Sequence, residues 1–349
     1  MKPVIFGLSG MTLTSAERSF FKECDPAGYI IFKRNIESRD QVLALTDALR
    51  ELHGRDDVAI LIDQEGGRVA RMQAPVWPEF PAGGAFDALY DVAPMSAIEA
   101  ARSNAEAIAL TLAQVGINVD CLPVLDVRVP GTHSAIGDRA LGSDPMRVAA
   151  LGRAIIDGLA AGGVISVVKH MPGQGRALVD THHELPHVRA TESELEQDLA
   201  PFRALNNAAM GMTGHVIYDV WDDQRPATTS PVIIEDIIRG KVGFDGLLIS
   251  DDLDMNALSG DLPSRALDCV AAGCDIALNC WGRIDEMEAI AMRLPEITEA
   301  ATVRLNRAMA GATLKFDAGR LAHLLDKRDQ LLALADTSSK LTHGATGAA

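Results

Sequence analysis

The stretch VISVVKH at residues 164–170 joins a run of apolar, mostly β-branched residues directly to a lysine and a histidine. A short continuous apolar run of this kind is typical of a strand that is buried on both faces of a parallel sheet. Lys169 and His170 then lie at the carboxyl end of the predicted strand. The same arrangement recurs along the chain.

Further runs share this pattern of apolar residues: VIFGLSG (4–10), GYIIFKR (28–34), VAILIDQE (58–65), INVDCLPVLDV (117–127), GMTGHVIY (211–218), GLLISDD (246–252) and CDIALNC (274–280). Stretches with helical periodicity separate most of them. Buried strands that alternate with helices predict an α/β protein, and the number of units favours a single-domain (β/α)8 TIM-type barrel. A doubly wound open sheet is the structural alternative.

Charged and polar residues follow several of these runs. In a barrel all of them would converge on the carboxyl-terminal face, where barrel enzymes keep their chemistry. Any one of them could be a satisfied structural group, but their convergence indicates a site. The residues are Asp63, Glu65, Asp126, Lys169, His170, His215, Asp251 and Asp252.

The length of 349 residues suits one such barrel. We expect residues 1–336 to form a single catalytic barrel domain with a C-terminal helical extension, because segment 284–336 reads as helix. The segment 337–349, TSSKLTHGATGAA, is small and polar. It has little to bury, so we expect a flexible tail.

The charge composition of the chain argues against two classes of binding partner. The net charge of −16, from 32 basic and 48 acidic residues, argues against nucleic acid and anionic membranes, which require a cationic face. The N-terminus lacks the long apolar segment of a signal peptide, and no window resembles a spanning helix. The chain has five cysteines without a C-x-x-C pair. Buried thiols in a reducing compartment fit this pattern, and we expect the cytoplasm.

The segment KHMPGQGRALVDTHHELP (169–186) concentrates histidine, aspartate and glycine. A metal site is one interpretation, but the first strand lacks the H-x-H ligands that barrel metal hydrolases use. A phosphate loop is another, although GQG completes no phosphate-binding motif. Proton transfer fits better, because Asp180 could fix the tautomer of His182 and raise its pKa, with Asp251 as a separate nucleophile. A plain polar loop stays open on these residues alone.

Five motifs in order then carry a resemblance: LIDQEGGRVAR (61–71), GDRALGSDP (137–145), KHMPGQG (169–175), DTHHELP (180–186) and GFDGLLISDDLDM (243–255). Together they resemble glycoside hydrolase family 3, in its bacterial β-N-acetylhexosaminidase branch that recycles cell-wall fragments. The resemblance covers roughly residues 3 to 285. We expect no second α/β domain of the kind that the larger β-glucosidase branch carries, because the sequence after the resemblance is too short for one.

The resemblance implies a retaining glycosidase that removes terminal β-linked N-acetylglucosamine without metal or cofactor. Asp251 matches the nucleophile that forms a glycosyl-enzyme intermediate, and His182 matches the general acid/base with Asp180 as its partner. Because Asp251 must stay ionised, we expect Lys169 or an arginine near it. The positions matching sugar-hydroxyl contacts are Asp63, Arg71, Arg139, Lys169 and His170, and those with supporting roles are Glu65, Arg68 and Asp252.

The implied substrate is a small molecule, an N-acetylglucosaminyl–anhydro-N-acetylmuramyl sugar with or without its peptide. The chain departs from the family pattern K-H-F-P-G-H-G at Met171 and Gln174. Glutamine cannot carry a proton, so any auxiliary acid–base role at 174 is lost. Neither change touches Asp251 or His182, so activity remains the expectation, and fine specificity is what the two changes leave open. The alternatives are a metal-dependent barrel amidohydrolase and a non-catalytic sugar-binding homologue, of which the second has no chemical need for Asp251, Asp180 and His182 together.

Overall fold

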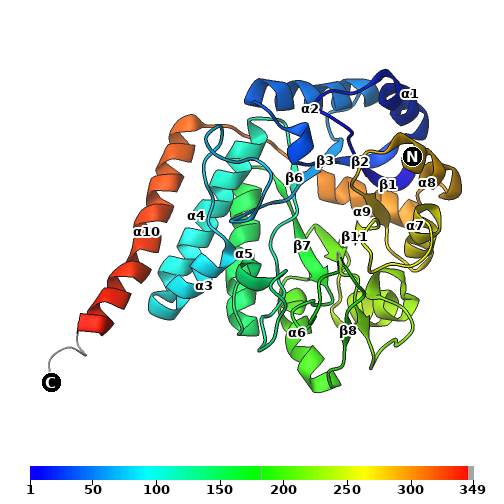
Figure 1. Cartoon of the computed structure of the whole chain (residues 1–349). Coiled ribbons are helices and arrows are strands. Elements are labelled where there is room, and N and C mark those ends of the chain that lie inside the picture. Colours follow the sequence, from blue (N-terminus) through cyan, green and yellow to red (C-terminus); the bar gives the residue numbers. More distant parts are fainter. Residues whose placement is uncertain (182, 345–349) are drawn as a thin grey trace.

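The computed structural model describes residues 1–181 and 183–344. Its centre is a closed parallel barrel with the strand order β1-β12-β11-β9-β7-β6-β3-β2 (Figure 1). The predicted barrel is therefore confirmed, and the open-sheet alternative is wrong. The barrel strands are β1 (Lys2–Gly7), β2 (Pro26–Ile31), β3 (Ala59–Ile62), β6 (Val119–Asp120), β7 (Ile165–Met171), β9 (Met210–Thr213), β11 (Leu247–Asp252) and β12 (Ile276–Asn279).

Helices surround the barrel, and two short sheets, β4 (Gln64–Gly66) with β5 (Val69–Ala70) and β8 (His187–Val188) with β10 (Ile217–Tyr218), lie in the loops. The helices are α1 (Ser15–Cys24), α2 (Arg39–His53), α3 (Gly83–Val92), α4 (Pro94–Ala113), α5 (Pro145–Ala161), α6 (Glu192–Ala204), a π-helix (Ile233–Lys241), α7 (Leu262–Ala271), α8 (Ile284–Arg293), α9 (Glu299–Met309) and α10 (Ala318–Gly344).

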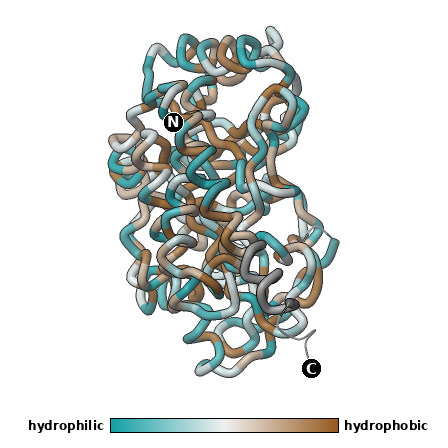
Figure 2. The backbone as a smooth tube through the Cα atoms, turned by 90° about the vertical axis from the view of Figure 1, so that its left-hand side faces the viewer, coloured by the Kyte–Doolittle hydropathy of each residue, from teal (hydrophilic) through white to brown (hydrophobic). Residues whose placement is uncertain are grey.

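Alternation along each strand separates two cores. Inward side chains such as Leu61, Val167 and Ile249 fill the barrel, together with Leu305 and Met309 of α9. Outward side chains pack against the helices in a second, larger cluster. Figure 2 shows hydrophobic residues gathered toward the middle of the molecule and hydrophilic ones toward its periphery. The strands are thus apolar on both faces, as parallel barrels require.

Local signals set where helices begin. Thr14 caps α1 and Thr191 caps α6, each in a capping box with the glutamate three residues later. The C-terminal helix α10 lies alongside α4 (Figure 1), where Arg328 Nη1 donates to Asn104 Oδ1 at 3.2 Å. The helix continues through 337–344, the first part of the predicted tail, and the mobility of that segment stays a prediction. Within the described residues, no helix has the length and apolarity needed to cross a bilayer.

Two barrel strands are irregular where they reach the carboxyl-terminal face. The register of β7 against β9 shifts between Val168 and Met171, and that of β11 against β12 shifts between Ile249 and Asp252. Regular strands point successive side chains to opposite faces, whereas a bulge re-aims them. These shifts accompany the consecutive pairs of polar residues that face one cavity.

Candidate active site

A cavity of about 340 Å³ opens at the carboxyl-terminal end of the barrel. This volume falls within the range of small-molecule sites, about 300–1,000 Å³. It collects the side chains from the ends of β2, β3, β7, β11 and β12. The polar residues that line it are Asp63, Glu65, Arg68, Arg71, Arg139, Lys169, His170, Gln174, Asp180, Thr181, Asp251 and Asp252.

A larger cavity of about 410 Å³ lies at the opposite end of the barrel. Three of its charged side chains pair with one another, since Asp275 accepts from Arg239 at 2.8 Å and from Arg304 at 2.9 Å. Such mutual pairing indicates a structural cluster that ties the amino ends of the strands together. We therefore place the chemistry at the carboxyl-terminal cavity, in keeping with barrel enzymes.

A buried ionic network forms one wall of this cavity. Lys169 Nζ lies 3.0 Å from Asp63 Oδ1 and 2.6 Å from Glu65 Oε1. Glu65 also accepts two hydrogen bonds of 2.8 Å from Arg139 Nε and Nη2, a bidentate pair. Arg71 Nη2 donates to Asp63 Oδ2 at 2.8 Å. Every residue of this wall is therefore held in a fixed direction before any ligand binds.

The network determines the charge state of its members. Burial alone would raise the pKa of Asp63 and of Glu65, but the cations beside them outweigh burial and lower both, that of Glu65 to about 2. Burial would likewise lower the pKa of Lys169, yet Asp63 and Glu65 raise it. All three groups stay charged near neutral pH, so this wall offers fixed ionic donors and acceptors to sugar hydroxyls.

Phe32 adds an apolar surface to the same wall. The Arg71 guanidinium carbon lies 4.9 Å from the centroid of the Phe32 ring, a cation–π contact. The contact orients Arg71, whose Nε makes no hydrogen bond within the described chain. Phe32 follows the apolar run of β2. Its position at a strand end is the sequence signal that could have identified it as a residue of the site.

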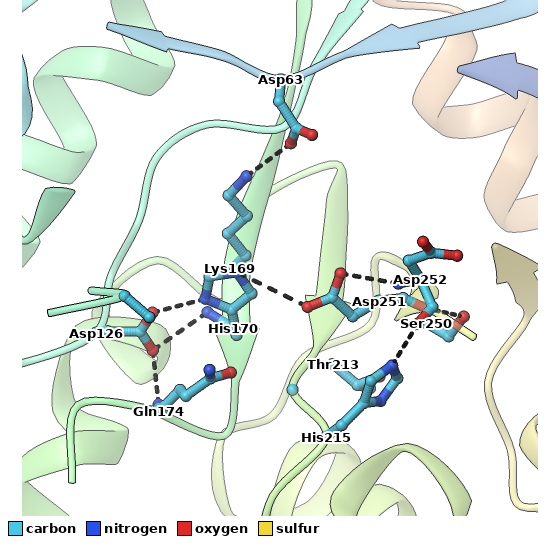
Figure 3. A network of polar contacts seen from close by, with 12 residues as sticks. Asp63, Asp126, Lys169, His170, Gln174, Thr213, His215, Ser250, Asp251 and Asp252 are labelled. Carbon is cyan, nitrogen blue, oxygen red and sulfur yellow. Dashed lines mark hydrogen bonds and ion pairs between the residues drawn. The ribbon is translucent and has the colours of Figure 1, made fainter. Parts of the chain in front are cut away.

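His170 follows Lys169 in the chain and lies between Asp126 and Asp251 (Figure 3). Its Nδ1 donates to Asp126 Oδ2 at 2.7 Å, and its Nε2 lies 4.0 Å from Asp251 Oδ2. A carboxylate can only accept, so Asp126 fixes the proton on Nδ1 and turns Nε2 toward Asp251. We expected Lys169 or an arginine near Asp251. Within the described residues, His170 is the basic group in ion-pair range of Asp251, and Lys169 pairs with Asp63 and Glu65 instead.

Replacing Asp126 by asparagine is expected to lower kcat/KM by about 10²-fold, because an amide no longer enforces the Nδ1–H tautomer of His170. The asparagine oxygen can still accept from the backbone amides of His170 and Gln174, which Asp126 Oδ1 binds at 3.3 and 2.6 Å. The measurement is a double-mutant cycle with His170→Gln. If Asp126 acts through His170, the double variant is no slower than His170→Gln alone; additive losses would contradict that role.

Asp251 and Asp252 both line the cavity but differ in surroundings. Burial raises the pKa of Asp252 to about 6, and the nearby Asp251 charge opposes its ionisation further. Asp252 Oδ1 accepts from the backbone amides of Asp254 and Cys280, each at 3.2 Å. Asp252 therefore stabilises the loop that follows β11 and its contact with the end of β12. Asp251, beside His170, is the carboxylate that faces an incoming ligand.

The loop after β7 brings Asp180 into the same cavity as Asp251. Its position is fixed by a backbone hydrogen bond of 3.2 Å from Ala257 to the Thr181 carbonyl, which joins it to the loop that follows β11. His182 lies outside the described residues. Its predicted acid/base role, with Asp180 as partner, stays a prediction.

The remaining described histidines do not gather at the cavity. His215 is buried and forms two hydrogen bonds, from Nδ1 to the Thr228 hydroxyl at 2.7 Å and from Nε2 to the Asp252 carbonyl at 2.9 Å. It is therefore a structural group despite its position at a strand end. Burial lowers its pKa. His187 pairs with Asp219 at 3.1 Å. Across residues 1–181 and 183–344, no cluster of His, Cys, Asp or Glu has the geometry to hold a metal ion.

The structure therefore brings together Asp63, Arg71, Arg139, Lys169, His170, Asp180 and Asp251, all of which the sequence proposed for the site. Arg68 lies at the rim and pairs with Asp138 at 3.1 Å. Two residues have a larger part than the sequence suggested. Glu65 is the centre of the ionic network, and Asp126 stands behind His170.

Comparison with known proteins agrees with this geometry. Residues 7–309 match the model of the glycosyl hydrolase family 3 N-terminal domain. A β-hexosaminidase from Alkalilimnicola ehrlichii is 38% identical over 310 residues, 87% of this chain and 88% of that protein. One from Chromobacterium violaceum is 38% identical over 332 residues, 91% and 89% of the two chains.

Solved structures show the same likeness. NagZ from Neisseria gonorrhoeae, in complex with N-trifluoroacetyl-D-glucosamine, superposes with a TM-score of 0.84 at 30% identity, covering 96% of this chain and 98% of that one. A family 3 β-N-acetylglucosaminidase from Paenibacillus sp. superposes with a TM-score of 0.79 at 30% identity, covering 96% and 66%.

Proposed function

This chain belongs to glycosyl hydrolase family 3 and is a β-N-acetylhexosaminidase, and from that premise we propose a substrate and a mechanism for it. The enzyme removes terminal, non-reducing β-linked N-acetylglucosamine from N-acetylglucosaminyl–anhydro-N-acetylmuramyl fragments, with or without their peptide. It works by retention, through a covalent glycosyl-aspartate intermediate. The observation that carries the mechanism is the position of Asp251, whose carboxyl group lines the cavity 4.0 Å from His170 Nε2.

In the first step, an Asp251 oxygen attacks C1 of the sugar, and the bond from C1 to the leaving oxygen breaks. The imidazolium of His182 gives its proton to that oxygen, so the aglycone departs as a neutral alcohol. In the second step, neutral His182 takes a proton from water. The water oxygen bonds to C1, the ester bond to Asp251 breaks, and the carboxylate is regenerated with the β configuration retained.

Histidine suits this task because its ordinary pKa lies near neutrality, so it needs little adjustment to act as both acid and base. Asp180 would hold the imidazole in one tautomer, as Asp126 does for His170. Because Asp63, Arg71, Arg139 and Lys169 are held rigidly by one another and by Glu65, they support binding of the sugar hydroxyls at little entropic cost. We also propose that the enzyme acts in the cytoplasm, in accord with a small, polar, cell-wall-derived substrate.

Wild-type protein should hydrolyse an aryl β-N-acetylglucosaminide and release the β-anomer first, with no loss when a chelator is present. The aryl β-glucoside should react slower by at least two orders of magnitude, since it lacks the acetamido group. Initial rates and the anomer seen by NMR are the measurements. Abolition by chelator would favour the amidohydrolase alternative, and sugar binding without turnover of either glycoside would favour the non-catalytic one.

The natural substrate needs its own test. A purified N-acetylglucosaminyl–anhydro-N-acetylmuramyl disaccharide and its peptide-bearing form should both release N-acetylglucosamine, as followed by mass spectrometry. A chitobiose control separates recognition of the aglycone from recognition of the glycone alone. Equal kcat/KM on chitobiose and on the anhydro-muramyl sugars would contradict the proposed aglycone.

A further inference from the structure

The carboxamide of Gln174 is a buried polar group without a partner at the edge of the catalytic cavity. The residue is 5% exposed, and its Oε1 accepts no hydrogen bond from any residue that the structure describes. Its Nε2 donates none within the same residues, while the backbone amide of Gln174 is fully used. A buried carbonyl oxygen left without a hydrogen bond costs stability, so the retention of Gln174 Oε1 calls for a physical reason.

The position of Gln174 is fixed by the same carboxylate that orients His170. Asp126 Oδ1 accepts the Gln174 backbone amide at 2.6 Å, while Asp126 Oδ2 accepts from His170 Nδ1 at 2.7 Å. Figure 3 shows the Gln174 side chain reaching toward the middle of the network, below the His170 ring. The backbone of Gln174 is therefore held beside His170, and its side chain lines the catalytic cavity.

Gly214 makes the room that this side chain occupies. A Cβ built on Gly214 would lie 2.8 Å from Gln174 Oε1 and 3.3 Å from His170 Cβ. Any larger residue there would push the carboxamide out of the cavity wall. The backbone of Gly214 is itself anchored, since its amide donates to the Met171 carbonyl at 2.8 Å. The neighbouring backbone thus leaves a defined place for an amide group.

We propose that Gln174 binds the 2-acetamido group of the sugar and is a specificity-determining residue for it. This inference rests on the proposed function. Asp251 must meet C1, and His170 Nε2 lies 4.0 Å from Asp251 Oδ2, so His170 borders the part of the cavity beside C1. Gln174 lines the same cavity and packs with His170 around Gly214, which places its carboxamide next to that part. C2 is bonded to C1, and its acetamido group falls in that part.

The chemistry of the two groups is complementary. An acetamido group carries one N–H donor and one carbonyl acceptor, and a carboxamide carries the matching acceptor and donors. The ring hydroxyls find charged partners in the ionic wall, while the leaving oxygen departs on the face opposite the nucleophile. A neutral amide at 174 adds no charge that would compete with Asp251 or with protonation of the acid/base.

The test compares the inhibition constants of free N-acetylglucosamine and free glucose in one assay, the hydrolysis of an aryl β-N-acetylglucosaminide. Gln174→Met keeps the length of the side chain and removes its hydrogen bonds. It should raise the constant for N-acetylglucosamine about tenfold and leave that for glucose unchanged. Gln174→Leu, which removes the carboxamide without adding a charge, is the second variant and should show the same selective loss.

The outcomes separate cleanly. A loss confined to N-acetylglucosamine in either variant supports the inference. Equal changes for both sugars, or none, overturn it and leave Gln174 as a structural or water-binding group while the proposed function stands. Absence of hydrolysis by the wild type removes the proposed function itself, and this inference with it. A lowered melting temperature with unchanged selectivity would also count against a binding role.

Discussion

Asp251→Asn should lower kcat/KM on an aryl β-N-acetylglucosaminide by about 10⁴-fold or more, the scale of losing the nucleophile of a covalent mechanism. The fold should be unaffected, because the asparagine oxygen can still accept the 2.8 Å hydrogen bond from the Asp252 backbone amide. The covalent step is checked with a 5-fluoro-N-acetylglucosaminyl fluoride. Intact mass should show a stoichiometric adduct on the wild type and none on the variant.

Asp252→Asn is the matched control, since it changes the adjacent acid of the same motif. With a pKa of about 6, Asp252 is partly protonated near neutral pH, and the neutral asparagine resembles that form. Its oxygen can keep both backbone contacts of Asp252 Oδ1. We expect activity within about tenfold of the wild type, as for a residue outside the chemical step. The reverse ranking of the two variants would move the nucleophile to Asp252.

Glu65→Gln should lower the free energy of unfolding by about 3–5 kcal/mol, the usual cost of breaking a buried ion pair from one side. Glu65 and Arg139 are 4% and 14% exposed, and Lys169 Nζ lies 2.6 Å from the same carboxylate. Removing this charge leaves two buried cations with less compensation. Urea unfolding gives the change directly, and kcat/KM should fall as well, because Arg139 and Lys169 lose their fixed directions.

The control for Glu65→Gln is Asp138→Asn, which breaks the Arg68–Asp138 pair at 3.1 Å, with side chains 47% and 58% exposed. Water screens an exposed pair, so the change should stay below about 1 kcal/mol. Comparable decreases in the free energy of unfolding for both variants would show that burial does not determine how much the Glu65 pair stabilises the fold.

The loss caused by Glu65→Gln should also depend on pH. Because folding lowers the pKa of Glu65 to about 2, its stabilisation is fully present above its unfolded value and is lost as pH falls toward the folded value. The unfolded value is about 4.3. The wild-type and Glu65→Gln stabilities should therefore converge as pH drops from about 4.3 toward 2. A gap that stays constant over this window would contradict an ionised Glu65 at neutral pH.

The barrel was predictable because its signal is local and repeated. Apolar runs alternating with helical periods identify each strand from its own residues, and their number favoured the closed barrel, which the strand order confirms, over an open sheet. The same logic placed Asp63, Lys169, His170 and Asp251 at one end of the barrel, since parallel strands share a carboxyl-terminal face. These statements need no knowledge of which strand lies beside which.

Only the tertiary structure decided which strand-end residues meet. His215 follows its strand as His170 does, yet it turns into the wall against Thr228. Lys169 and His170 are consecutive but face one cavity, because the register shifts between Val168 and Met171. The direction of a side chain at the end of a strand depends on such shifts.

Pairings across distant segments were equally out of reach of the sequence. Glu65 meets Arg139 across 74 residues and Asp126 meets His170 across 44, and no local period encodes either contact. The polar residues that follow each strand could be identified from the sequence pattern alone. Their distances, and hence their charges and roles, depend on how the closed barrel brings separate loops to one wall.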